Sequence, residues 1–240
     1  MNMGQYETME LTETQSAGMR AYFNRIYTYM AGGLGVSAGV AYLATKEPLF
    51  SLFYSISNGS VGLSVLGWIA VFAPLLMVFM ISSATAKMNA ERAGTLFWIF
   101  SALMGVSLSN VLLAYTGVSV FRTFLICSAG FLGLSLYGYT TKKSLTGLGS
   151  FLMMGLIGLL VAMVVNIFMK SAALDWALSV IGILIFAGLT VFDTNRLKAA
   201  YHDGLPESAQ KSLAISGALA LYLDFINLFQ FLLSFLGDRR

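Results

Sequence analysis

The chain has 240 residues, of which 58% are hydrophobic and only 10% are charged, and its formal net charge is +3. Soluble domains carry about 25% charged residues, so this chain has too few of them to cover a water-facing surface. The basic residues are scattered over short segments, which argues against a nucleic-acid-binding surface. The composition therefore predicts an integral membrane protein whose first partner is the lipid bilayer.

The N-terminal segment, residues 1–21, is polar and carries three glutamates. It lacks the basic-then-apolar pattern of a cleavable signal, so we expect the first membrane helix to direct its own insertion. We predict a polar cytoplasmic tail over residues 1–21 and a transmembrane domain over residues 22–240.

Seven apolar segments follow, each close to the 20 or so residues that a helix needs to cross the hydrocarbon core. Only "GVS" divides the third from the fourth, and Pro74 predicts a kink in the second. The expected fold is all-α, a bundle of seven transmembrane helices. The first five segments lie near residues 25–45, 61–83, 95–116, 119–139 and 148–169. The sixth starts near residue 172 and includes "LSVIGILIFAGLTVFDTNRL", and the seventh lies near 213–236.

Basic residues in short connections predict which side of the bilayer is cytoplasmic. The bias favours a cytoplasmic N-terminus and an outward C-terminus, although "GDRR" at the C-terminal end would prefer the cytoplasm. With the N-terminus inside, the cytoplasmic segments hold Arg20, Arg25, Lys87, Arg92, Lys142, Lys143, Arg196, Lys198 and Lys211, and the outer ones hold Lys46, Arg122, Lys170, Arg239 and Arg240.

Two carboxylates interrupt apolar runs, Asp193 in "LTVFDTNRLK" and Asp224 in "ALALYLDFINLF". An ionisable group at mid-bilayer costs about 2.5–3.5 kcal/mol on insertion scales, and such groups are usually functional. If the sixth helix continues to about Asp203 and the seventh begins near Leu213, each acid lies roughly 15 Å from the loop that joins the two helices. This spacing allows the two acids to pair at one depth.

Two adjacent carboxyl groups share one proton, because both cannot ionise cheaply. A protonated pair would clamp the two helices together, whereas an ionised pair would repel, hydrate and attract a hard cation such as Ca²⁺. Asp193 and Asp224 are therefore our candidate pH sensor, gate and transient calcium ligands. A simpler alternative pairs Asp193 with Arg196 at the membrane edge and leaves Asp224 to neighbouring hydroxyls or amides.

The last helix carries more polar side chains than the others, so we expect it to lie at the centre, where surrounding helices satisfy them. Asp224, Asn227 and Ser234 share one face of this helix. We predict that Tyr222, Asn227 and Arg196 support the carboxyl pair. The polar residues of the last helix are Tyr222, Asp224, Asn227, Gln230 and Ser234.

Motifs for enzyme chemistry or a resident cofactor are absent from the sequence. The single cysteine, Cys127, excludes an internal disulfide and is expected to be a small buried core residue. There is no histidine cluster, P-loop or serine elbow. Intramembrane aspartyl proteases also use two aspartates, but their "YD" and "GxGD" motifs differ from "VFDTNR" and "YLDFIN". We predict a non-enzyme without a cofactor and keep an intramembrane hydrolase as an alternative.

Four long motifs resemble, in order, the bacterial branch of the Bax inhibitor-1 family, also called the transmembrane Bax-inhibitor-motif family. The resemblance covers about residues 22–240 and implies a seven-helix bundle with the last helix surrounded by the other six. The motifs are "FWIFSALMGVSLSNVLLAYTGVS", "SLYGYTTKKSL", "FAGLTVFDTNRLK" and "GALALYLDFINLFQFLLSFLGDRR".

The resemblance also implies a function, a pH-sensitive calcium leak across the bacterial inner membrane with Asp193 and Asp224 as the sensor. In the family an arginine of the second helix approaches the pair. The second span here has none, and Arg196 is the electrostatic substitute. Some bacterial relatives instead bind and modulate a membrane-anchored AAA protease. The alternative function is therefore a non-conducting regulator that presents its polar N-terminal tail.

Overall fold

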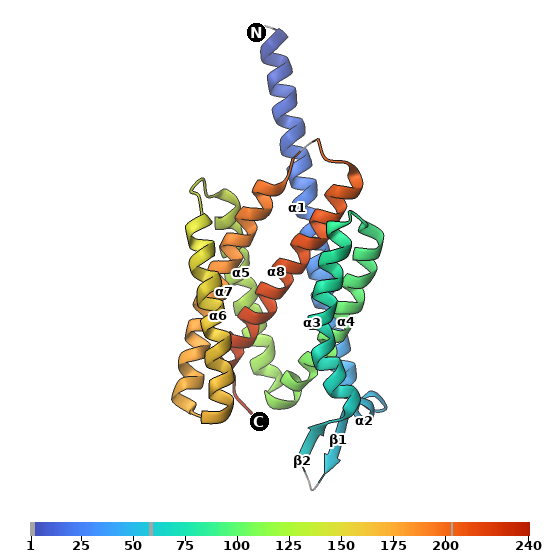
Figure 1. Cartoon of the computed structure of the whole chain (residues 1–240), viewed down its shortest axis with the longest axis vertical. Helices are drawn as coiled ribbons and strands as arrows, with labels where there is room; N and C mark the ends of the chain where they lie inside the picture. The colour runs from blue at the N-terminus through green and yellow to red at the C-terminus, as the bar shows by residue number, and fades with distance from the viewer. Residues whose placement is uncertain (1–2, 58–59, 203) are drawn as a thin grey trace.

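The computed structural model describes residues 3–57, 60–202 and 204–240. Apart from one two-stranded hairpin, the regular elements of this part of the chain are helices, and the long ones run side by side as a bundle (Figure 1). The elements are α1 (Met3–Ala44), α2 (Leu49–Phe53), β1 (Tyr54–Ser57), β2 (Ser60–Leu63), α3 (Val65–Ala86), α4 (Ala90–Ala114), α5 (Gly117–Thr140), α6 (Thr146–Met169), α7 (Ala172–Ala200) and α8 (Glu207–Leu236).

Six helices in the described part of the chain, α3 to α8, are long and apolar enough to cross a membrane. The prediction of a polytopic helical membrane protein is confirmed at this level. Helix α1 is not among the six, because the glycines, serines and tyrosines of "YTYMAGGLGVSAGVAY" lower its hydropathy. Its first turns project beyond the bundle (Figure 1), and the helix runs unbroken through the expected tail boundary after residue 21.

The boundaries of the second, third and fourth spans are well defined. The third and fourth spans are separate helices, because the chain turns at Tyr115 and Thr116 between α4 and α5. The second span begins at Val65 rather than 61, because residues 60–63 form β2, which pairs with β1. Pro74 lies inside α3 without ending it.

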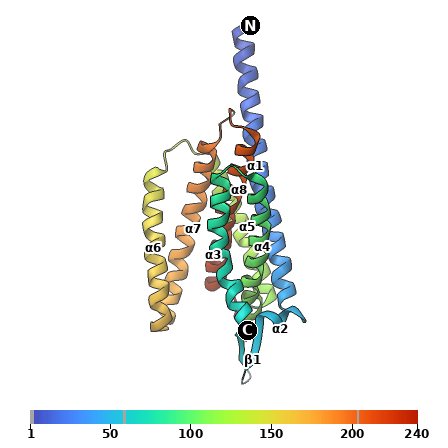
Figure 2. The ribbon, with the colours of Figure 1, turned by 45° about the vertical axis from the view of Figure 1, so that its right-hand side comes forward.

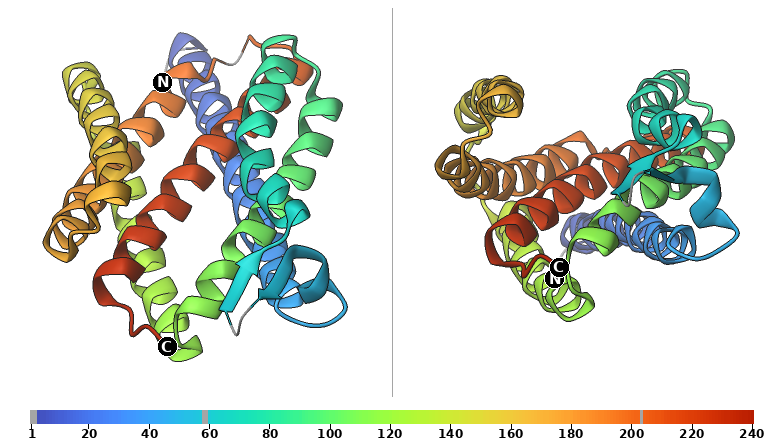
Figure 3. Two further views of the ribbon diagram at one scale, coloured as in Figure 1. Left: turned by 60° about the horizontal axis from the view of Figure 1, so that its bottom comes forward. Right: turned by 90° about the horizontal axis from the view of Figure 1, so that it is seen from below.

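Helix α8 lies at the centre of the bundle, in agreement with the expectation from its polar residues. It packs against α1, α3, α4, α5 and α7. Of an 18-residue apolar stretch of α8, 50% is buried inside the bundle. The expectation that six helices surround α8 is wrong for α6. Helix α6 packs chiefly against α7 at one edge of the bundle (Figures 2 and 3), and only 11% of its 18-residue apolar stretch is buried. A side of α8 therefore faces space between α6 and α7.

The stretch "GLGVSAG" in α1 places Gly35 and Gly39 at GxxxG spacing, but the close packing of α1 on α4 uses other glycines. A Cβ atom on Gly105 would lie 2.7 Å from the backbone oxygen of Ser37, so only glycine fits there. A Cβ on Gly35 or Gly39 would meet no atom within 4 Å. The GxxxG spacing in α1 is therefore not used within the bundle.

Candidate functional site

The carboxyl pair lies where α7 and α8 run antiparallel. Near one end of the contact, the hydroxyl oxygens of Ser179 and Ser234 are hydrogen-bonded at 3.0 Å. Near the other, a Cβ on Gly217 would come 2.8 Å from Cδ2 of Leu197. These contacts set the register of the two helices. Between them, the carboxyl groups of Asp193 and Asp224 interact directly.

The ends of α7 and α8 differ from those that we expected from the sequence. Helix α7 ends at Ala200, and α8 begins at Glu207 rather than near residue 213, while Asp203 lies outside the described residues. Asp193 is thus about 10 Å from the end of its helix, and Asp224 is roughly 25 Å from the start of its own. The acids still meet because α8 crosses the bundle diagonally (Figure 1), so that its first turns lie away from α7.

Asp193 forms an ion pair with Arg196 one turn later on α7. The distance from Nη2 of Arg196 to Oδ1 of Asp193 is 3.0 Å, and the two side chains are 57% and 13% exposed. The guanidinium group also lies over the ring of Phe192, 5.8 Å from its centroid. The ion pair of Asp193 with Arg196, which we considered as the simpler alternative, is therefore present together with the interaction between Asp193 and Asp224.

Asp224 is the buried member of the pair, at 5% exposure. Its Oδ2 atom has no hydrogen-bond partner among the described residues. The groups that act on it electrostatically are Asp193 and Arg196. The alternative in which hydroxyls or amides satisfy Asp224 is therefore wrong for this part of the chain.

Tyr222 and Asn227, which we predicted to support the pair, lie elsewhere. The Tyr222 hydroxyl is hydrogen-bonded to Oγ of Ser37 at 2.6 Å, and its ring packs on Phe100 of α4. Asn227 donates to the backbone oxygen of Leu223 at 2.8 Å and lines a pocket. Of the predicted supporting residues, the structure brings only Arg196 to the pair.

Polar residues that the sequence did not reveal lie near Arg196 and Thr194, on the turn of α7 that carries Asp193. Tyr22 of α1 is buried within electrostatic range of Arg196, and its hydroxyl has no hydrogen-bond partner in the described part of the chain. Thr194 hydrogen-bonds to Ser135 of α5 at 3.0 Å, and Ser135 to Tyr27 of α1 at 2.5 Å. These bonds tie three helices together beside the pair. Single tyrosines and serines within helices carry no sequence signal that could have identified them.

The carboxyl pair alone offers few of the oxygen ligands that a calcium ion takes. Ca²⁺ takes six to eight oxygen ligands, and the pair offers two carboxylates. Among the residues that the structure describes, no group of three histidine, cysteine or acidic side chains could hold a metal ion. Cys127 is fully buried, as expected for a small core residue.

The fold and the pair define a polytopic helical membrane protein with a buried carboxyl group between two of its membrane helices. Residues 19–240 match the family described as inhibitor of apoptosis-promoting Bax1, and the chain belongs to this Bax inhibitor family. The resemblance noted from the sequence motifs is thereby confirmed.

Relatives of similar length support the assignment. An uncharacterized protein of Caulobacter vibrioides is 47% identical over 93% of this chain and 91% of its own length. The protein RP147 of Rickettsia prowazekii is 43% identical, with 97% and 96% covered. The inner membrane protein YbhL of Escherichia coli is 40% identical, with 93% and 94% covered.

Proposed function

We propose that this protein is a pH-sensitive calcium leak channel gated by Asp193 and Asp224. The observation that carries the proposal is the buried carboxyl group of Asp224, which lies beside a second carboxyl group and lacks a hydrogen-bond partner for Oδ2. A buried ionisable group in such a position is usually functional, because an uncompensated charge there is costly.

The charges around the pair suggest how the gate works. Arg196 supplies one positive charge, which balances one carboxylate. With one proton shared between Asp193 and Asp224, the group of three is neutral and holds α7 to α8. Loss of that proton leaves a net charge of −1 inside the bundle, and the two carboxylates repel each other. Water and a cation then enter to compensate, so the leak opens as the pH rises.

Reconstituted protein tests the proposal. In liposomes loaded with a calcium dye, calcium influx through the wild-type protein is expected to increase with pH. Asp224→Asn and Asp193→Asn each replace one carboxyl group of the pair by an amide that cannot ionise. No second carboxyl group is then left to share a proton, so the wild-type pH dependence is expected to be lost. Asp238→Asn changes an acid outside the pair and serves as the matched control. If Asp224→Asn leaves both the influx and its pH profile unchanged, the carboxyl pair is not the gate.

One observation favours the alternative, a non-conducting regulator of a membrane-anchored AAA protease. The first turns of α1 project beyond the bundle (Figure 1), where a partner in the aqueous phase can reach them. Co-purification with a membrane protease that is lost on deleting residues 2–20, together with silent liposomes, would establish this alternative. Retained calcium influx after the same deletion would favour the channel.

The proposal includes a location and a topology. We place the protein in the inner membrane with α1 as the seventh span, a cytoplasmic N-terminus and an outward C-terminus. The name of the Escherichia coli relative, an inner membrane protein, and the bias of basic residues support this arrangement. A reporter fused after residue 240 that is active only outside the cytoplasm tests the topology. Activity of a cytoplasmic reporter at that position would reverse it.

A further inference from the structure

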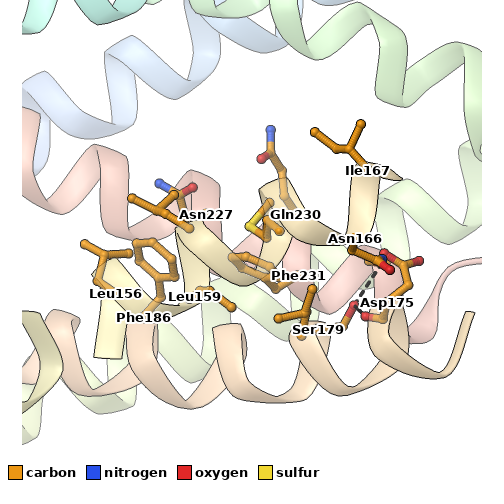
Figure 4. Close-up of a pocket in the computed structure, with 14 residues that line it drawn as sticks. Leu156, Leu159, Asn166, Ile167, Asp175, Ser179, Phe186, Asn227, Gln230 and Phe231 are labelled. Carbon is orange, nitrogen blue, oxygen red and sulfur yellow. Dashed lines mark hydrogen bonds between the residues drawn. The ribbon is translucent and has the colours of Figure 1, made fainter. Parts of the chain in front are cut away.

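A pocket of about 420 Å³ lies between α6, α7 and α8, apart from the carboxyl pair. It forms because α6 packs chiefly against α7 and leaves a side of α8 uncovered. Asn166 and Asp175 lie at one end, near the α6–α7 turn, and Asn227 lies at the other, beside Leu156 and Phe186 (Figure 4). From Asp175 to Phe186 the pocket extends roughly 16 Å along α7.

The α8 wall of the pocket is polar, although it lies within a membrane-spanning helix. Asn227, Gln230 and Ser234 all line the pocket and follow one another at helical spacing. The carboxamide of Gln230 has no hydrogen-bond partner among the described residues, and Asn227 uses one N–H on its own helix. Amides left against hydrocarbon are costly, so these groups favour water as the occupant. The volume has room for on the order of ten water molecules.

The polar wall leads toward the carboxyl pair. Asn227 follows Asp224 by one turn on the same face of α8, and Phe186 precedes Asp193 by about two turns on one face of α7. The Phe186 ring is buried and stacks on Phe231, with 5.8 Å between centroids. The inner end of the pocket is thus about one helical turn from the pair, beside this stacked pair of rings.

The outer end of the pocket carries an acid. Asp175 lines the pocket, and its Oδ2 lies 3.4 Å from Nη2 of Arg239. Both side chains are more than half exposed, at 52% and 65%. An ion pair this exposed contributes little stability and exchanges readily, so the Asp175 carboxylate is accessible to an arriving cation.

We infer that the pocket between α6, α7 and α8 is a water-filled vestibule that admits the permeant cation from the Asp175 end toward the carboxyl pair. The inference rests on the proposed cation leak and adds the route to it. Asn227 and Gln230 supply oxygen atoms that replace part of the cation's water shell inside the bundle.

Cysteine accessibility tests whether the vestibule holds water. Cys127→Ala removes the one native thiol, and single cysteines then replace Gln230 or Ser234 in the pocket. Matched controls are Val165→Cys and Leu184→Cys on exposed apolar positions outside the pocket. A membrane-impermeant trimethylammonium thiosulfonate is added to both faces of proteoliposomes. Thiolates form readily only in water, so the pocket cysteines are expected to react at least ten times faster than the controls.

Two readouts separate this inference from the leak itself. Attaching the cationic group at Gln230→Cys is expected to reduce calcium influx at least two-fold, and a reductant is expected to restore it. Pocket cysteines that react as slowly as the controls would mean that lipid fills the space, which overturns the vestibule even if Asp224→Asn alters the influx. Reactive cysteines whose modification leaves the influx unchanged would overturn the route. Reactive cysteines with no influx at any pH would overturn the leak.

Discussion

Gly138 of α5 lies directly against the backbone of α7 at Val191. A Cβ atom on Gly138 would come 2.5 Å from the backbone oxygen of Val191 and 3.0 Å from Cβ of Thr194. A backbone carbonyl within a helix cannot turn aside as a flexible side chain can, so only glycine fits this position. The contact fixes α5 against the turn of α7 that carries Asp193.

Gly138→Ala is therefore expected to separate α5 from α7 and to lower the stability of the bundle. Overpacking of this kind costs about 1–3 kcal/mol. Thermal unfolding followed by circular dichroism in detergent measures the change. Gly133→Ala on the same helix is the control, because a Cβ there would meet no atom within 4 Å. The control is expected to be neutral or stabilising, and an equal loss in both variants would contradict the importance of the Val191 contact.

Arg196→Gln tests the charge balance at the pair. Removing the guanidinium takes away the positive charge that favours the ionised carboxylates, so a lower proton concentration is needed to ionise them. The pH profile of calcium influx is expected to move toward alkaline pH by about one unit, at the low end of such effects because Arg196 is exposed.

The control for this prediction is Arg196→Lys, which keeps the charge and is expected to keep most of the wild-type profile. A shift of the Arg196→Gln profile toward acidic pH, or the same shift in both variants, would show that Arg196 does not act through its charge.

Tyr222→Phe separates stability from gating. The hydroxyl group is hydrogen-bonded to Ser37 in the core, and its loss is expected to lower the free energy of unfolding by about 1 kcal/mol. Tyr222 faces α1 and α4 rather than Asp193, so the pH profile of influx is expected to stay unchanged. Thermal unfolding and influx measured on one preparation check both halves. A shifted pH profile of calcium influx in Tyr222→Phe would show that Tyr222 takes part in gating.

The C-terminal tail offers a comparison between part-buried hydrogen bonds and an exposed ion pair. Oγ of Ser119 accepts from the Asp238 backbone N–H at 3.0 Å and donates to its Oδ2 at 2.9 Å. Arg122 approaches the same carboxylate only to 3.8 Å, with both side chains more than half exposed. Ser119→Ala is expected to cost about 1–2 kcal/mol, and Arg122→Gln less than about 0.5 kcal/mol. Thermal unfolding distinguishes them, and the reverse order would contradict this account.

The two acids were identifiable from sequence because carboxylates within apolar runs are conspicuous, and their adjacency agrees with the proposed pairing. Their role in gating stays a prediction. The end of α7 at Ala200 could not be predicted, because no glycine or proline marks it. The tilt of α8, which brings Asp224 to Asp193, arises from packing on five other helices and leaves no local sequence pattern.

Other features differ in how visible they were. The hairpin carries a sequence signal that our span prediction overlooked, since Asn58 and Gly59 stand between alternating apolar residues such as Ile56 and Val61. The pocket carries none, because it depends on how far α6 stands from α8. Gln230 is an amide in an apolar helix, which indicates a polar environment, but the sequence does not show which helices face that amide.

The central position of α8 has a consequence for biosynthesis. A chain emerges from the ribosome from its N-terminus onward, so α8 is made after all five helices that pack around it. The contacts of α8 with α1, α3, α4, α5 and α7 can therefore form only late in synthesis, and the burial of Asp224 depends on them.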